Sequence, residues 1–140
     1  MNRVLVGVDG SEGSWRAAEF ARDVARAFRA QLTLLHVIEP LPEGPLTALD
    51  DSPQSAYYAA RMAKACQFMR ELADGLGVTE AEQVIEMGRP SDVIVGEAAE
   101  RNVDLIVVGS HGHSQGTRLL NGSVGARLAT ISDRSVTIVR

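Results

Sequence analysis

Apolar residues along this chain recur at two spacings, and segments with one spacing alternate with segments that have the other. Short runs of aliphatic and β-branched residues predict β-strands at residues 3–8, 31–38, 83–87, 104–109 and 134–140. Between these runs, apolar residues return every three or four positions, as they do on one face of an amphipathic helix. The pattern therefore predicts a chain in which strands and helices alternate.

The first predicted helix is expected to be capped at its start by Ser11 or Ser14. Its apolar stripe consists of Ala17, Phe20, Ala21, Val24, Ala25 and Phe28. The longest helix is expected at residues 54–76, and two shorter helices are expected at residues 91–102 and 123–132. The stripe of the longest helix, which we expect to pack into the core, consists of Ala59, Met62, Cys66, Met69, Ala73 and Leu76.

The order of the elements, β-α-β-α-β-α-β-α-β, argues for an α/β fold. The runs at residues 3–8 and 104–109 are almost wholly apolar, which is typical of parallel strands that helices cover on both faces. The proline-rich residues 39–53 are expected to form a loop. We therefore predict a doubly wound parallel sheet between two helical layers, in a single domain that spans residues 1–140.

Composition and charge narrow the classes of function. The 140 residues are 45% hydrophobic and 23% charged, and the formal net charge is −4. The chain has no cluster of Lys and Arg, which argues against nonspecific binding of nucleic acid. No apolar run approaches the roughly 20 residues that cross a bilayer, and the start of the chain is typical of a strand rather than a signal peptide. The single Cys66 cannot form an internal disulfide, so we expect a cytoplasmic protein.

The most unusual stretch of sequence lies between the fourth predicted strand and the last helix. It reads GSHGHSQGTRLLNGS from Gly109 to Ser123, and Gly112 and Gly122 lie ten positions apart within it. A glycine- and serine-rich loop that leads from a buried strand into a helix can hold a phosphate, because exposed backbone N–H groups and the positive helix end attract the anion. The loop therefore predicts a phosphate-binding site.

A second polar turn, Asp9-Gly10-Ser11, follows the first predicted strand. In doubly wound sheets, ligands bind outside the carboxyl ends of the strands, where the strand order reverses. If the first and fourth strands are neighbours, both turns line one crevice and converge on the same anion. The chain offers only a weak match to the dinucleotide pattern, with Glu39 as the nearest acidic candidate, and it has no G-K-[ST] P-loop.

Several of these features together resemble the universal stress protein family, in its nucleotide-binding branch. They are Asp9 after the first strand, His36-Val37-Ile38 at the end of the second, Gly88-x-Pro90 after the third, the G-x2-G-x9-G-S signature from Gly109 to Ser123, and the terminal strand V-T-I-V-R. The resemblance covers the whole chain. It implies a five-stranded parallel sheet of order 3-2-1-4-5 in a Rossmann-like three-layer αβα sandwich, and a homodimer that pairs through the C-terminal strand.

The same resemblance implies a bound adenine nucleotide, ATP, accompanied by Mg²⁺. It implies that Val37 offers backbone groups to the adenine, that Asp9 lies close to the nucleotide, and that Gly109 lies near the ribose. The residues implied around the phosphates are Gly112, Gly122, Ser123 and Val124. The other residues that we expect to line the site are Gly10, Ser11, Met87, His111 and His113.

For some of these residues a second interpretation stays open. Asp9 could instead cap the first helix or stabilise its turn. If it contacts the nucleotide, it fits the adenine, the ribose or the Mg²⁺ ion better than a bare phosphate, since like charges repel. His111 and His113 lie two positions apart without a third ligand nearby, which argues against zinc; either could touch phosphate or lie in solvent. Gly125 stands where a helix former is more usual, and we expect it to loosen the turn after the phosphate site.

The function that these residues favour is regulatory. No catalytic constellation is evident in the sequence, so we expect a nucleotide-responsive regulatory or stress-tolerance module, with a protein partner still to be identified, rather than an enzyme. Two alternatives remain. One is a slow metal-dependent ATPase, and the other is a partner-binding dimer that uses AMP or cyclic AMP.

Overall fold

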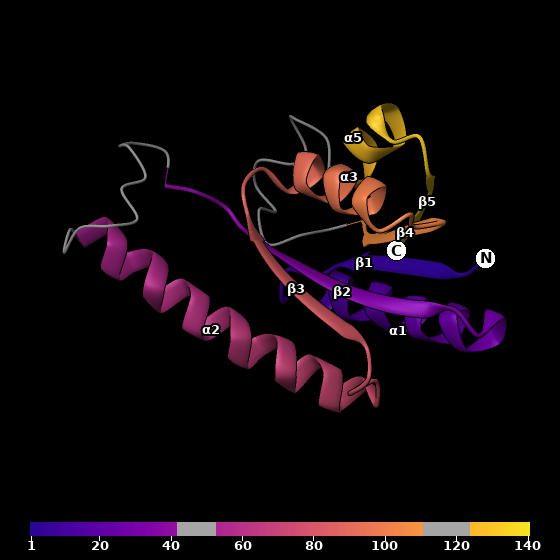
Figure 1. The fold of residues 1–140 in the computed structure, drawn as a ribbon, viewed down its shortest axis with the longest axis horizontal. Helices are drawn as coiled ribbons and strands as arrows, with labels where there is room; N and C mark the ends of the chain where they lie inside the picture. Colours follow the sequence, from indigo (N-terminus) through magenta and orange to yellow (C-terminus); the bar gives the residue numbers. More distant parts are fainter. Residues whose placement is uncertain (42–52, 111–123) are drawn as a thin grey trace.

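The computed structural model describes residues 1–41, 53–110 and 124–140 of the chain. Within these ranges, strands and helices alternate in the predicted order (Figure 1). The elements are β1 (Arg3–Gly7), α1 (Glu12–Phe28), β2 (Gln31–Ile38), α2 (Pro53–Leu76), β3 (Glu82–Met87), α3 (Pro90–Glu100), β4 (Leu105–Gly109), α5 (Val124–Ile131) and β5 (Ser135–Val139). The observed bounds differ from the predicted ones by no more than one or two residues.

The strands form one parallel sheet in the order β3-β2-β1-β4-β5, as the family resemblance implied. β1 lies at the centre and pairs on both sides, so that Val6 lies beside Leu34 of β2 and beside Val107 of β4. Every pairing in the sheet is parallel. The carboxyl ends of all the strands therefore lie at the same edge of the sheet, and those of β1 and β4 are neighbours there.

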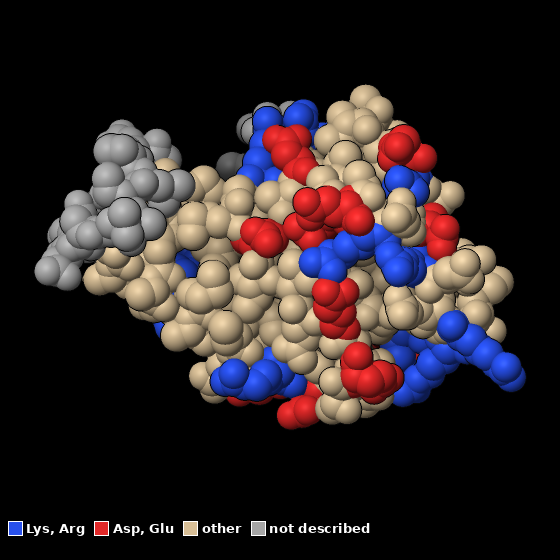
Figure 2. Space-filling model, in the orientation of Figure 1, with Lys and Arg blue, Asp and Glu red and all other residues tan. Residues whose placement is uncertain are grey.

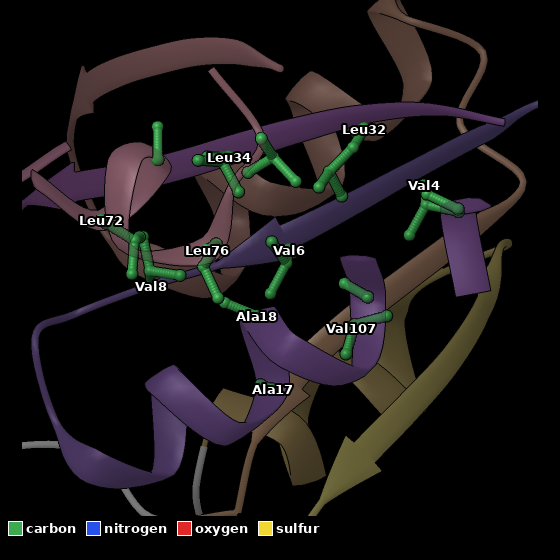
Figure 3. Close-up of a cluster of buried hydrophobic side chains, with 14 of the residues drawn as sticks. Val4, Val6, Val8, Ala17, Ala18, Leu32, Leu34, Leu72, Leu76 and Val107 are labelled. Atoms are coloured by element: carbon green, nitrogen blue, oxygen red, sulfur yellow. The ribbon is translucent and has the colours of Figure 1, made fainter. Parts of the chain in front are cut away.

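Helices cover both faces of this sheet (Figure 1). Successive residues of a strand point to opposite faces, so each central strand contributes to two cores. Val4 and Val6 pack with residues of α1 and α2 (Figure 3), whereas Leu5 packs with Ile94 of α3 and Leu128 of α5. Burial of such side chains, at about 25 cal/mol for each Å² of apolar surface, holds the three layers together. The predicted αβα sandwich is confirmed.

The buried stripe of α1 is narrower than its sequence predicts. Ala17, Ala21 and Ala25 are buried, but Phe20 is 41% exposed and Phe28 is 58% exposed. The small alanine side chains let the backbone of α1 approach the sheet closely, and the bulky rings are left at the margin of the contact. The expectation that both phenylalanines share the buried face is therefore wrong.

The stripe of α2 is buried only in the second half of the helix. Met69, Ala73 and Leu76 are buried, Cys66 is half-buried, and Met62 is 38% exposed. Figure 1 shows the reason, since the first turns of α2 project beyond the strands that its second half covers. The prediction that Met62 packs in the core is therefore wrong. None of the helices in the described ranges is long and apolar enough to cross a membrane.

Candidate functional site

The candidate site lies at the carboxyl edge of the sheet, between the ends of β1 and β4. The chain runs outward from β1 to β2 and β3 and then returns to β4 on the other side of β1, so the strand order reverses at this pair. Doubly wound sheets bind their ligands at such a reversal. The turn that follows Gly7 and the end of β4 at Gly109 are thus brought to the same edge, as the strand order implied by the family resemblance predicted.

Asp9 and Ser11 form a tight polar turn ahead of α1. The N–H of Ser11 donates to Asp9 Oδ1 at 2.9 Å, and Gly10 between them has a φ of 83°, a left-handed conformation that favours glycine. The N–H of Ser14 donates to Ser11 Oγ at 3.1 Å, which makes Ser11 the N-cap of α1. Ser14 Oγ accepts from the N–H of Asp9 at 3.2 Å. Asp9 therefore stabilises this turn, which holds its carboxylate at the edge of the sheet.

Gly109, at the end of β4, lies against the first turn of α1. A Cβ atom at this position would lie 2.7 Å from both the carbonyl carbon and the carbonyl oxygen of Gly13, and 3.1 Å from the backbone nitrogen of Ser14. Backbone atoms at such distances cannot make room for a side chain, so glycine is required here. The close contact brings the end of β4 next to the turn that contains Asp9.

Ser110 is a polar residue at this edge that the sequence analysis did not assign to the site. Its N–H donates to the carbonyl oxygen of Val139 at 2.8 Å, so the backbone pairing with β5 continues to the residue that follows β4. Side chains alternate along a strand, which places that of Ser110 on the same face as Val108, the face that α5 covers. Ser110 Oγ is buried and has no hydrogen-bond partner among the described residues. The signal in the sequence is a serine directly after a wholly apolar strand.

Val37 lies where β2 has run past the end of β1. The register of the two strands ends at Gly7 and Leu35, and one further bond joins the N–H of Val8 to the carbonyl oxygen of Leu35 at 2.8 Å. Backbone groups alternate in direction along a strand, so the N–H and C=O of Val37 also point toward the β1 side. Beside Val37, the segment that follows β1 has already turned away from the sheet toward Asp9. The backbone groups of Val37 are therefore directed toward the strand-end site.

The other predicted site residues fall into two groups. Met87 ends the edge strand β3 beside Ile38 and is exposed, and Val124 is the exposed first residue of α5. Met87 lies two strands away from β1, so it stands at the outer side of the carboxyl edge. The remaining five lie outside the described residues: His111, Gly112, His113, Gly122 and Ser123.

Gly125 determines how closely α5 lies on the sheet. A Cβ atom there would lie 3.0 Å from two side-chain carbons of Ile138 in β5 and 3.4 Å from a side-chain carbon of Val108 in β4. The missing side chain lets the first turn of α5 rest directly on these two strands. The glycine that we expected to loosen this turn therefore has a packing role.

Asp104, directly before β4, ties the start of the chain to the amino edge of the sheet, opposite the candidate site. The carboxylate of Asp104 accepts from the N–H groups of Asn2 at 2.7 Å and Arg3 at 2.9 Å, and these bonds hold the pKa of Asp104 below its usual range. Figure 2 shows acidic and basic side chains interspersed over the broad face of the molecule that is viewed there. No group of three potential metal ligands occurs in the described part of the chain.

A doubly wound sheet with polar strand ends at its point of reversal defines an α/β protein of the kind that binds small ligands at that edge. The model of the universal stress protein family matches residues 1–140, and the chain belongs to that family. Universal stress protein YxiE of Bacillus subtilis (strain 168) is 33% identical over 147 residues, which cover 99% of this chain and 99% of that one.

Solved structures show the same fold. Universal stress protein UspA from Lactobacillus plantarum superimposes with a TM-score of 0.86 at 25% identity, covering 99% of this chain and 97% of that one. A universal stress protein solved in complex with cAMP has a TM-score of 0.71 at 34% identity, with the same coverage of 99% and 97%. The second relative thus holds an adenine nucleotide.

Proposed function

We propose that this protein binds an adenine nucleotide, ATP with Mg²⁺, at the carboxyl ends of β1, β2 and β4, and acts as a nucleotide-responsive regulatory module. The observation that carries the proposal is Ser110 Oγ, a buried hydroxyl without a partner among the described residues. A buried hydroxyl left without a hydrogen bond costs about 1–3 kcal/mol. A ligand at the point of strand reversal would remove that cost.

The backbone of Val37 supports an adenine base. Its N–H and C=O are directed toward the site because β1 ends before β2 does. Adenine carries hydrogen-bond donors and acceptors along its edges, so one residue that presents both a donor and an acceptor can pair with it. Recognition through the backbone does not depend on the side chain, so a residue with an apolar side chain such as valine can bind the base.

The face of the sheet that carries Ser110 supports the phosphate end. The positive end of the helix dipole favours an anion, and α5 starts on this face at Val124. Ser110 Oγ can donate a further hydrogen bond. The donor set therefore fits a phosphate group.

Asp9 is the carboxylate that fits the metal ion. In nucleotide sites, Mg²⁺ is usually held by one or two carboxylates together with the phosphates. The bond from the N–H of Ser11 at 2.9 Å keeps the Asp9 carboxylate at the end of β1. A magnesium ion there would neutralise the repulsion between this carboxylate and the phosphates.

We further propose that two copies pair through β5. β5 is an edge strand, and Ile138 in it is 41% exposed; Val124 and Ile131 of α5, the helix that contacts β5, are exposed as well. Since the carbonyl oxygen of Val139 accepts from β4, alternation directs the backbone groups of Ile138 outward. An exposed apolar edge of this kind is a template for pairing with another chain.

A second candidate is a preference for cyclic AMP, which the solved complex of a relative at 34% identity favours.

The test is mass spectrometry of any ligand released from freshly purified protein, followed by competition between ATP with Mg²⁺ and cyclic AMP. The proposal expects ATP to be released or to compete more strongly. Stronger competition by cyclic AMP would support the second candidate, and phosphate release that disappears in Asp9→Ala would instead support an ATPase.

A further inference from the structure

Arg127 joins the beginnings of two helices on the same face of the sheet. It is the fourth residue of α5, and its Nε donates to Ser91 Oγ at 2.9 Å, in the first turn of α3. Its Nη2 lies 3.4 Å from Asp92 Oδ1, but both of these side chains are largely exposed, and such pairs contribute little. Ser91 is only 2% exposed. The bond to its buried hydroxyl is therefore the contact that matters.

This bond spans the two ends of the proposed site. α3 starts just after Gly88, whose N–H donates to the carbonyl oxygen of Ile38 at 3.0 Å. The start of α3 is thus tied to the end of β2, next to Val37 at the base end. Arg127 belongs to α5, whose start lies at the phosphate end. One side chain therefore connects the elements that would hold the base with the helix that would face the phosphates.

The other contacts of α5 are apolar and do not fix its first turn by a directional bond. α5 has eight residues, too few for a stable helix without tertiary contacts. Leu128 is fully buried in one cluster with Ile94 of α3, and Gly125 rests against Ile138. These contacts hold α5 against the sheet and against α3. The bond from Arg127 to Ser91 adds a directional contact between the first turns of α5 and α3.

We propose that Arg127 is a positioning residue, which holds the first turn of α5 in place for the phosphates relative to the base-binding end of β2. This inference rests on the proposed nucleotide site. Without the bond, the first turn of α5 must be ordered when the phosphates bind, and that cost lowers the affinity. A nucleoside has no phosphates, so its affinity depends far less on Arg127.

The test compares ATP with adenosine as ligands of the full chain in the presence of Mg²⁺. Arg127→Met keeps most of the aliphatic stem and removes the donors, and we expect an affinity loss of about three- to tenfold for ATP but less than about twofold for adenosine. Ser91→Ala removes the same bond without changing the charge, so it should reproduce the selective loss. The double variant should lose no more than either single variant, because both remove one interaction.

Arg22→Met is the matched control, since it removes an arginine that pairs with Asp23 on α1, and it should alter neither affinity. Equal losses for ATP and adenosine in Arg127→Met and Ser91→Ala would overturn the positioning role, as would an unchanged ATP affinity in both. If Arg127→Met does not fold, Ser91→Ala alone decides. If the wild type binds neither ligand, the proposed nucleotide site is wrong. If the wild type binds ATP, the affinities of the variants test the role of Arg127 alone.

Discussion

Gly109 and Gly13 bring the end of β4 into backbone contact with the first turn of α1. A Cβ atom on Gly109 would lie 2.7 Å from the carbonyl oxygen of Gly13. We therefore expect Gly109→Ala to lower the free energy of unfolding by about 1–3 kcal/mol, since overpacking against backbone atoms forces the two elements apart. Chemical denaturation monitored by circular dichroism measures this change.

Gly96→Ala is the matched control for that substitution. Gly96 lies in α3. Apart from its chain neighbours and the backbone of its own helix, no described atom would lie within 4 Å of a Cβ atom added there. Alanine favours a helix over glycine, so the free energy of unfolding should rise by about 0.5–1 kcal/mol. If Gly109→Ala proves as stable as Gly96→Ala, the close contact with Gly13 does not constrain residue 109.

Ser110→Ala separates a ligand contact from a structural one. Ser110 Oγ is buried without a partner among the described residues, so its removal should leave the stability unchanged or raise it slightly. The affinity for ATP should fall by about tenfold or more, because a hydrogen bond to a charged group is lost. Thermal denaturation and ligand titration of the same preparation test both parts. A clear loss of stability with unchanged affinity would mean that the hydroxyl serves the fold instead.

Asp104 links stability to pH. Its carboxylate accepts hydrogen bonds from the N–H groups of Asn2 and Arg3, which lower its pKa in the folded state below its ordinary value of 3.8. A pKa lowered by folding stabilises the protein fully above about pH 4. That contribution is lost as the pH falls through the folded-state pKa.

Asp104→Asn should therefore be less stable than the wild type at pH 7, and the difference should shrink toward zero in strong acid. Denaturation at a series of pH values measures it, with Glu100→Gln at the exposed end of α3 as the control. A difference in stability that stays constant from pH 7 down to acid would contradict the role of the Asp104 carboxylate.

Ile138 tests the proposed pairing of β5. Lysine on an edge strand opposes the addition of another strand, so Ile138→Lys should convert a dimer into a monomer. Light scattering after size-exclusion chromatography measures the mass in solution. Phe28→Lys, which changes another exposed apolar residue, on α1, should leave the dimer intact. A dimer that survives Ile138→Lys but not Phe28→Lys would place the interface on α1.

The fold was largely predictable because its pattern is local. Aliphatic runs such as the one that contains Val107 identify buried parallel strands, and the strand order then followed from the family resemblance. Helical spacing was less informative for Phe20 and Met62. It shows which residues of a helix share a face, but not how far the neighbouring sheet extends beneath that face, so the exposed margin of α1 and the projecting turns of α2 were missed.

The meeting of the two polar strand ends was predictable, but the details of the candidate site were not. The polar turn at Asp9 and the glycine at 109 both lie at the predicted edge. The direction of the backbone groups of Val37 depends on where β1 ends relative to β2, and the missing partner of Ser110 depends on tertiary contacts. Neither property is encoded in a local pattern. The predicted roles of Gly122 and Ser123 stay predictions, because these residues lie outside the described ranges.

The central claim is that this chain binds an adenine nucleotide at the point of strand reversal. Isothermal titration calorimetry of the purified protein with ATP and Mg²⁺ tests it most directly. Gly122→Leu serves as the comparison variant, because its substitution lies outside the described helices and strands. We predict saturable binding to the wild type at or below about 1 mM nucleotide, with one site per chain, and loss of binding in the variant. The absence of saturable binding to the wild type at that concentration would contradict the claim.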